Sequence, residues 1–185
     1  MKATEAKLLD FLKKSSQFVV PIYQRTYSWT EKECRQLWDD IVRCGKNERT
    51  LVHFIGSIVY VESGLSQVTH QSPLLVIDGQ QRLTTVSLLL AALAKEVEEK
   101  EPFDGFSRRK IYNYYLLNPE EAGERHYKLI LSQNDKDTLT SLVSGHPQPE
   151  HVSIRVSENF SVFQKWIKDG EVDLTTLCKG LAKLV

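Results

Sequence analysis

The sequence predicts an α+β fold in which helices surround and extend a small mixed β-sheet. Three patterns predict it. A short apolar run at residues 74–77 turns at Gly79 and continues into a long helix that is apolar on almost every side. A capping-box pattern at residues 30–33 starts another amphipathic helix. The second half of the chain shows mostly helical spacing of its apolar residues.

The N-terminal part predicts a helix, a strand and a second helix. In residues 4–14 three apolar side chains share one helical face, with Thr4 as the candidate N-cap. Residues 18–20 have an extended pattern, and Pro21 fixes a turn after them. Beyond the capping box, apolar residues recur at helical spacing until Gly45, where we expect the helix to end.

The middle of the chain predicts two strands and the central helix. Residues 54–61 are rich in β-branched and aromatic residues, and residues 74–77 form a second apolar run. The polar stretch 62–72 separates them, so we expect the two strands to pair. Residues 83–97 then predict a helix in the middle of the core, because most of its circumference is apolar.

The following segment predicts a helix at residues 108–117, which stops at Asn118-Pro119. Residues 127–131 alternate like a strand, and residues 137–143 return to helical spacing. We expect residues 1–145 to form the main domain.

Residues 146–185 predict the start of a helical extension. Apolar residues recur at helical spacing over 156–167 and again over 174–184. No helix-stop signal follows Leu184. We therefore expect the last helix to continue to the chain end and the chain to be a fragment of a longer protein.

The composition predicts a soluble, cytoplasmic protein without strong unspecific affinity for nucleic acid. Lys and Arg together number 24, as do Asp and Glu, so any contact with DNA must be local. The longest apolar run, residues 86–94, is far shorter than the ~20 residues of a membrane span. The three cysteines are odd in number and not spaced as a metal or redox pair, so we expect neither a disulfide nor a structural zinc.

The strongest candidate site is the turn from Asp78 to Arg82. The first N–H groups of a helix have no partners within the helix, and the helix dipole is positive there, so this turn can bind an anion. Gly79 lets a phosphate approach the backbone, Arg82 can bind it bidentately, and Gln80 or Gln81 can orient a phosphate or a water. Asp78 can hold a magnesium ion. The alternative is a plain helix cap followed by a solvated first turn.

A second candidate lies in the irregular segment 20–29. Aromatic residues can stack on a base and Arg25 can reach a phosphate or a guanine edge. For Tyr23, Gln24 and Arg25 a packing role and a ligand-binding role are both open, whereas for Trp29 we favour packing. Weaker candidates are His53 and the pair Asp39–Asp40, for which structural and solvated roles are favoured.

Several established motifs are absent from the sequence, including the phosphate loop, the dinucleotide fingerprint, the serine nucleophile elbow and the zinc-protease helix. His146 and His151 also lack the surroundings of a His-Asn-His nuclease. Any chemistry on a nucleoside triphosphate (NTP) must therefore use an unusual site.

Four motifs occur in order along the chain: Pro21-Ile22-Tyr23-Gln24-Arg25-x-Tyr27-x-Trp29, Leu37-Trp38-Asp39-Asp40, His53-Phe54-x-Gly56-Ser57-Ile58-Val59 and Ile77-Asp78-Gly79-Gln80-Gln81-Arg82-Leu83-Thr84-Thr85. In this order they resemble the motif series of the GmrSD restriction endonuclease N-terminal domain family. Weaker likeness continues through Lys128-Leu129-x-Leu131-x-x-x-Asp135 and Arg155-x-x-x-Asn159-Phe160-x-x-Phe163. The resemblance thus covers nearly the whole chain.

The resemblance implies a core similar to the ParB and sulfiredoxin folds, in which a strand, a turn and a helix start hold nucleotide phosphates. It assigns binding and hydrolysis of an NTP, GTP or ATP with Mg²⁺, to the Asp78–Arg82 turn, with Gly79, Arg25 and Thr84 contacting the nucleotide. Members of the family restrict phage DNA that carries modified bases or backbones. By position, Tyr23, Gln24 and Arg25 correspond to the segment linked to sensing the modification.

The sequence departs from the family pattern at its end, where a Phe-Glu-x-Leu-Asn stretch and a His-Asn-His nuclease domain are missing. We therefore expect no DNA cleavage by this chain alone, and the NTP cycle would gate a nuclease domain or subunit supplied elsewhere. One alternative is a non-catalytic regulatory module that binds nucleotide or DNA. Another is a purely structural interaction domain.

Overall fold

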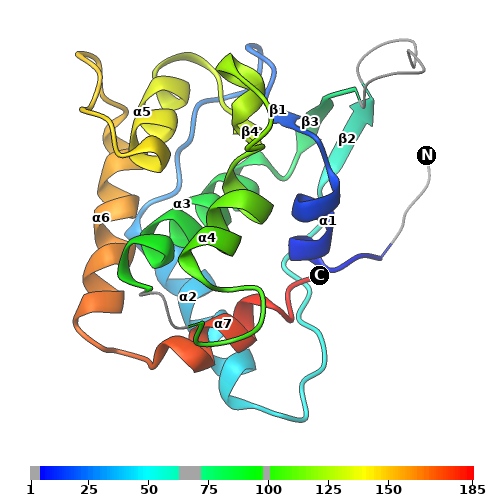
Figure 1. Ribbon diagram of the computed structural model, residues 1–185, viewed down its shortest axis with the longest axis vertical. Coiled ribbons are helices and arrows are strands. Elements are labelled where there is room, and N and C mark those ends of the chain that lie inside the picture. The colour runs from blue at the N-terminus through cyan, green and yellow to red at the C-terminus, as the bar shows by residue number, and fades with distance from the viewer. Residues whose placement is uncertain (1–4, 63–71, 98–100) are drawn as a thin grey trace.

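The computed structural model describes residues 5–62, 72–97 and 101–185, and within them a four-stranded sheet lies beside a helical body (Figure 1). The strands are β1 (Phe18–Val19), β2 (Val59–Glu62), β3 (Leu74–Asp78) and β4 (Leu129–Ile130). Their order in the sheet is β2-β3-β1-β4. Strand β1 pairs in parallel with β3 and β4, whereas β2 pairs antiparallel with β3, so the sheet is mixed as predicted.

The other regular elements of the described residues are helices, which confirms the α+β prediction. They are α1 (Leu8–Lys14), α2 (Glu31–Lys46), α3 (Gln80–Glu96), α4 (Arg108–Ile111), α5 (Gln133–Ser144), α6 (Ile154–Lys168) and α7 (Leu174–Leu181). A π-helical turn, η1 (Tyr112–Leu116), continues α4, and a 3-10 turn, η2 (Gly123–His126), precedes β4. Helix α1 lies against the sheet, since Phe11 packs on Phe18 of β1 and on Tyr60 of β2.

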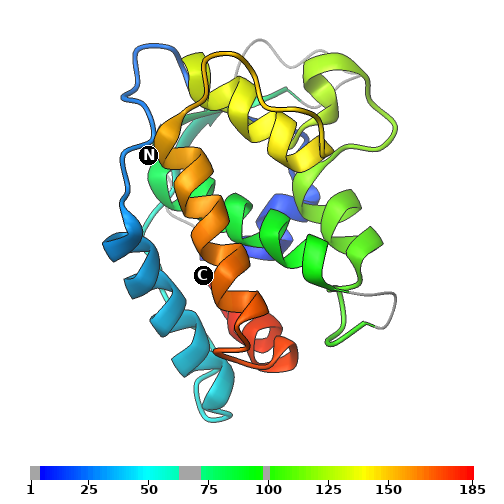
Figure 2. The same cartoon turned by 90° about the vertical axis from the view of Figure 1, so that its left-hand side faces the viewer.

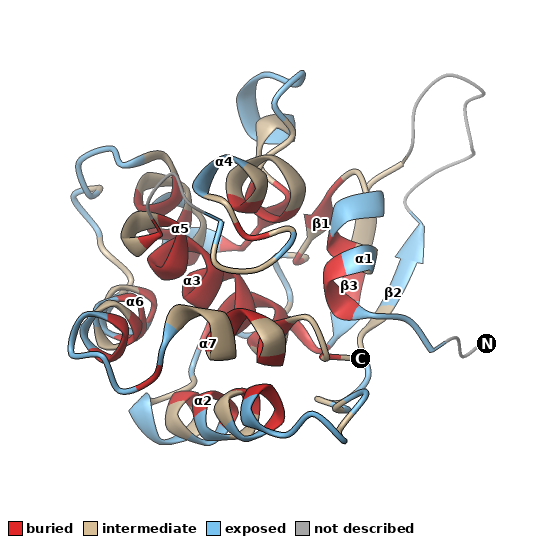
Figure 3. Cartoon of the chain, turned by 60° about the horizontal axis from the view of Figure 1, so that its bottom comes forward, coloured by how far each residue is buried: buried red, intermediate tan, exposed pale blue. Residues whose placement is uncertain are grey.

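Helix α3 is the centre of the core, as its apolar circumference predicted. Every residue from Leu83 to Ala94 is buried, and α4, α5 and α6 pack around the helix (Figures 1 and 3). Helices α6 and α7 contribute to the same hydrophobic cluster through Phe163 and Leu177. The start of α3 is therefore fixed by packing on several sides.

Helix α2 begins at the predicted capping box. The Thr30 side chain accepts from the Lys32 N–H, and both the N–H and the hydroxyl of Thr30 donate to Glu33 Oε2 at 2.7 Å. The predicted end at Gly45 is wrong by one residue, because α2 continues through Lys46.

Gly45 is instead a packing residue. A Cβ at Gly45 would lie 2.0 Å from the carbonyl oxygen of Thr176, and one at Gly180 would lie 2.0 Å from that of Ile41. The missing side chains allow the backbones of α2 and α7 to approach closely, and the two helices lie side by side (Figure 2).

Two further predicted boundaries are wrong. The strand expected at residues 54–61 begins only at Val59, while residues 53–55 pair with the last residues of the chain: His53 donates to Lys183, Val185 to His53 and Ile55 to Val185. The last helix, expected to continue to the chain end, stops at Leu181. Leu184, which fitted the helical spacing, lies outside the helix. It is fully buried and forms a β-bridge with His53.

The remaining differences are smaller. Helix α5 starts at Gln133, four residues before the predicted start at Asp137, and ends at Ser144; the next residue, Gly145, has φ of +70°. The candidate N-cap Thr4 lies outside the described residues, and Lys7 occupies the N-cap position of α1. All three cysteines are buried free thiols. Within the described part of the chain, no helix has the length and apolar character needed to cross a membrane.

Candidate functional site

The turn between β3 and α3 is built around Gly79. This residue has φ of +88° and occupies the N-cap position, so α3 begins at Gln80 as the sequence predicted. Its N–H donates to Asp78 Oδ1 at 2.7 Å. A Cβ at Gly79 would lie 2.8 Å from the Ser57 carbonyl oxygen. On that side, the missing side chain of Gly79 therefore makes room for the backbone of Ser57.

The N-terminus of α3 carries no side-chain cap and no acidic residue in its first turn. A helix that starts in this way leaves several N–H groups without an acceptor in the helix, with positive potential around them. Asp78 is exposed and Arg82 half-exposed, whereas Gln80 and Gln81 are only 9% and 6% exposed. The side chains of this turn that reach solvent are therefore those of Asp78 and Arg82.

Gln24 joins the irregular segment 20–29 to this turn. Its Nε2 donates to the carbonyl of Ile77 at 3.0 Å, and its Oε1 accepts from Gln80 Nε2 at 3.3 Å. Gln24 therefore contacts the last residues of β3 and the first residue of α3. Two motifs that lie more than 50 residues apart in the sequence meet here.

Gln81 also binds the segment 20–29, at Thr26 and Ser28. Its Oε1 accepts from the Ser28 N–H at 2.8 Å and from the Ser28 hydroxyl at 3.4 Å, while its Nε2 donates to the Thr26 carbonyl at 3.2 Å. Both ends of this buried amide are thus used by the segment. The sequence suggested a ligand-facing role for Gln81, and the structure gives it a structural partner.

Arg82 connects the turn to the third motif. Its Nη1 donates to the Ser57 carbonyl at 3.0 Å, and a Cβ at Gly56 would lie 2.5 Å from Arg82 Cζ. The guanidinium therefore packs on the bare backbone of Gly56. Segments 20–29 and 53–58 and the Asp78–Arg82 turn meet at the start of α3.

The comparison with known families decides what this arrangement belongs to. A family model described as the N-terminal domain of GmrSD restriction endonuclease matches residues 8–182. The chain belongs to this family. No curated protein matches the chain.

In this GmrSD N-terminal domain, the predicted DNA-sensing residues differ in exposure. The side chains of Tyr23 and Arg25 are exposed, and Tyr23 reaches 73%. Neither makes a hydrogen bond or ion pair with any described residue. Gln24 is half-buried and holds the segment to the turn. The sequence suggested one role for all three residues. In the structure Gln24 anchors the segment, whereas Tyr23 and Arg25 are exposed.

Thr84 lies one turn further into α3. It is 1% exposed, and its hydroxyl donates to the Gln80 carbonyl at 2.8 Å. Its contact with a nucleotide stays a prediction. The same holds for magnesium at Asp78: no group of three or more His, Cys, Asp or Glu side chains in the described residues could hold a metal ion.

The weaker candidates lie in other surroundings. His53 Nε2 is 3.7 Å from Asp40 Oδ2, and the backbone of His53 pairs with the C-terminal residues. Trp38 is buried against Phe163 and Trp166, and Asp39 is exposed on α2. The Leu37–Asp40 motif of the GmrSD domain thus carries two core residues, one exposed carboxylate and one half-buried carboxylate.

The sequence did not predict the contacts by which Tyr27, Asp135 and Asn159 hold the segment 20–29 in place. Tyr27 is 5% exposed and bonds to Asp135 of α5, Asn159 of α6 and Thr85 of α3. Burial raises the pKa of the Tyr27 phenol far above its usual range and that of the neighbouring Cys34 thiol to about 11, so both groups stay protonated. The weaker likeness around Asp135 and Asn159 was the available signal.

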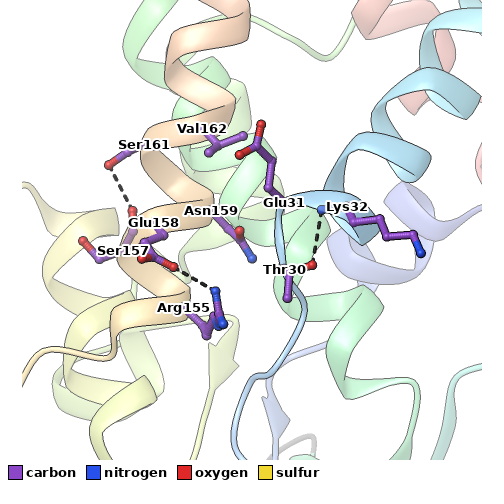
Figure 4. A pocket seen from close by; sticks show the side chains of 9 residues that line it. All are labelled: Thr30, Glu31, Lys32, Arg155, Ser157, Glu158, Asn159, Ser161 and Val162. Carbon is purple, nitrogen blue, oxygen red and sulfur yellow. Dashed lines mark hydrogen bonds and ion pairs between the residues drawn. The ribbon is translucent and has the colours of Figure 1, made fainter.

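Two pockets lie outside the turn. One, of about 570 Å³, is lined by the start of α2 and by α6, including Thr30, Arg155 and Asn159 (Figure 4). The other, of about 410 Å³, lies beside η2 and α5. Neither pocket is lined by a residue from Asp78 to Arg82.

Proposed function

We propose that this GmrSD N-terminal domain binds and hydrolyses an NTP at the start of α3 and senses modified DNA through the neighbouring segment 20–29. Membership of the family implies that the chain is part of a restriction endonuclease, with DNA and a nuclease part as partners. The convergence of three separated motifs on one helix start is the observation that carries the proposal.

The electrostatics of the turn support a phosphate ligand. The uncapped N-terminus of α3 offers N–H donors, and Arg82 brings a cation whose direction is fixed by Ser57 and Gly56. A preorganised arginine loses little freedom when it binds a phosphate. Arg25 adds a second, freely exposed cation on the adjoining segment.

Asp78 fits a role beside a phosphate-bound magnesium ion. Its Oδ1 is held by the Gly79 N–H, so the carboxylate is fixed at the end of β3 and stays exposed. Magnesium usually uses one or two carboxylates together with phosphate oxygens. When bound, the ion neutralises charge that develops on the phosphates. In this proposal Gln80 orients the attacking water, and Gln81 holds the backbone of the sensing segment.

The exposed residues Tyr23 and Arg25 suit contact with DNA. A tyrosine that is mostly exposed can stack on a base, and an exposed arginine that pairs with no described residue can bind a phosphate or a base edge. Because Gln24 joins their segment to Gln80, contact with DNA can alter the geometry of the NTP turn. The NTP cycle would then gate the nuclease part.

Phosphate release from MgGTP and MgATP at saturating concentration, with and without DNA, tests the proposal. We expect turnover of at least one nucleotide and a change in rate when modified DNA is added. Nucleotide binding without turnover would instead support a regulatory binding module. If neither nucleotide shifts the melting temperature or releases phosphate, the proposed function is wrong.

A further inference from the structure

Tyr27 is tied to three helices at once. Its N–H donates to Asp135 Oδ2 of α5 at 2.6 Å, and its hydroxyl lies 2.7 Å from Thr85 Oγ1 of α3. Asn159 Nδ2 of α6 donates to the same hydroxyl at 3.0 Å. All four residues are at least 95% buried, so water does not compete for these bonds.

The direction of each bond in this chain follows from the donors. The Thr85 hydroxyl donates its one proton to the Gln81 carbonyl at 2.8 Å, so Tyr27 must donate to Thr85. Tyr27 in turn accepts from Asn159. An ordered chain therefore runs from Asn159 of α6 through Tyr27 and Thr85 to the first turn of α3.

Asp135 and Asn159 each hold a second group. Asp135 Oδ1 accepts from the hydroxyl of Ser153, the N-cap residue of α6, at 2.5 Å. The second hydrogen of Asn159 Nδ2 goes to the Trp29 carbonyl at 2.8 Å. The carboxylate thus bridges the starts of α5 and α6, where helix dipoles favour a negative charge. The two helices hold the segment at Tyr27 and at Trp29.

We propose that Asp135 and Asn159 are positioning residues for the NTP turn. They hold Tyr27 and Trp29 by hydrogen bonds, and we call these bonds the clamp. The clamp keeps residues 23–25 at the position in which Gln24 bonds to Gln80. A displacement of α5 and α6 is thereby transmitted to the site. Asn159 also lies beside the pocket between α2 and α6 (Figure 4). The effect on nucleotide binding rests on the proposed function; the clamp itself does not.

Hydrogen–deuterium exchange on the 185-residue chain tests the clamp. Asp135→Asn and Asn159→Ala should raise exchange in peptides covering residues 20–30 about tenfold, well below the melting temperature, because buried bonds that hold the segment are lost. Asp137→Asn, which changes an exposed carboxylate on the same helix, should leave exchange unchanged. Unchanged exchange in residues 20–30, or an equal rise over the whole chain, would overturn the clamp.

Tyr27→Phe serves if the other variants fail to fold, because it removes a single oxygen atom. Tyr114→Phe, at a half-buried tyrosine outside the clamp, is its control. Titration with MgGTP and MgATP then tests the coupling: Asn159→Ala should raise the dissociation constant about tenfold, and Asp137→Asn should not. Equal affinity of Asn159→Ala and the parent, with loosened residues 20–30, would overturn the coupling. If the parent binds neither nucleotide, the proposed function fails and the coupling with it, while exchange decides the clamp.

Discussion

Gly56 lies directly against the guanidinium of Arg82, so that a single methyl group at position 56 would stand 2.5 Å from Arg82 Cζ. The residue after it, Ser57, accepts the Arg82 Nη1 hydrogen bond at 3.0 Å. Gly56 also has φ of +105°, a conformation that other residues rarely adopt. The 53–58 motif thus sets the direction of the one cation in the Asp78–Arg82 turn.

Gly56→Ala should displace Arg82 and weaken binding of MgGTP or MgATP about tenfold, as loss of a charged phosphate contact would. Strain at the positive φ should also lower the free energy of unfolding by about 1–3 kcal/mol. Gly123→Ala is the matched control, since Gly123 has φ of +61° and a methyl group there would meet nothing within 4 Å. Calorimetric titration and urea unfolding measure both effects. Equal nucleotide affinity in the two variants would contradict the role given to Gly56.

Asp78→Asn should abolish NTP hydrolysis while leaving the fold intact. The amide oxygen of asparagine can still accept the Gly79 N–H, but the substitution removes the negative charge proposed to face magnesium. We expect phosphate release to fall at least ~100-fold, as for loss of a charge-stabilising contact. Asp137→Asn controls for a change of charge elsewhere. Phosphate release at the parental rate by folded Asp78→Asn would place the chemistry at another site.

Tyr23→Ala should impair the response to modified DNA and leave basal NTP turnover unchanged. Tyr23 is 73% exposed, so its loss should change the free energy of unfolding by less than about 0.5 kcal/mol. Ile22→Ala, at a neighbour that is 77% exposed, controls for loss of apolar surface. The measurement is phosphate release with modified and unmodified DNA of the same sequence. A parental response in Tyr23→Ala would remove this residue from sensing.

The α2 cap predicts a pH dependence of stability. Hydrogen bonds from the side chain and backbone of Thr30 hold the pKa of Glu33 below its ordinary value of 4.5. Because the folded-state pKa is the lower one, the stabilisation is present above the unfolded-state pKa and is lost as pH falls through the folded-state pKa. Glu33→Gln should therefore lose less stability than the parent between about pH 5 and pH 3 in urea unfolding. Gln36→Ala, at an exposed residue of the same helix that does not titrate, should keep the parental acid sensitivity.

Local patterns were sufficient to predict the start of the site. Gly79 followed by an apolar helix predicted the strand, the turn and the buried helix α3, because these depend on backbone conformation and burial of neighbouring residues. The capping box at Thr30 was predicted for the same reason. Both are interactions between residues a few positions apart.

Long-range contacts could not be predicted in this way. Gln81 looked like a ligand-facing residue, yet its amide is used by Thr26 and Ser28, which lie over 50 residues earlier. Gly45 matched a helix end, but a glycine also permits close helix packing, and the partner at Thr176 is distant in the sequence. The residue pattern of one segment does not show which distant segment packs against it.

The central claim is that Arg82 and the start of α3 bind the phosphates of an NTP. The most direct measurement is calorimetric titration of MgGTP and MgATP into the parent, Arg82→Ala and the control Arg109→Ala, whose arginine is exposed on α4. We predict that the parent and Arg109→Ala bind one nucleotide equally well and that Arg82→Ala binds it at least ~10-fold more weakly. Equal affinity in all three proteins, or no binding by the parent, would contradict the claim.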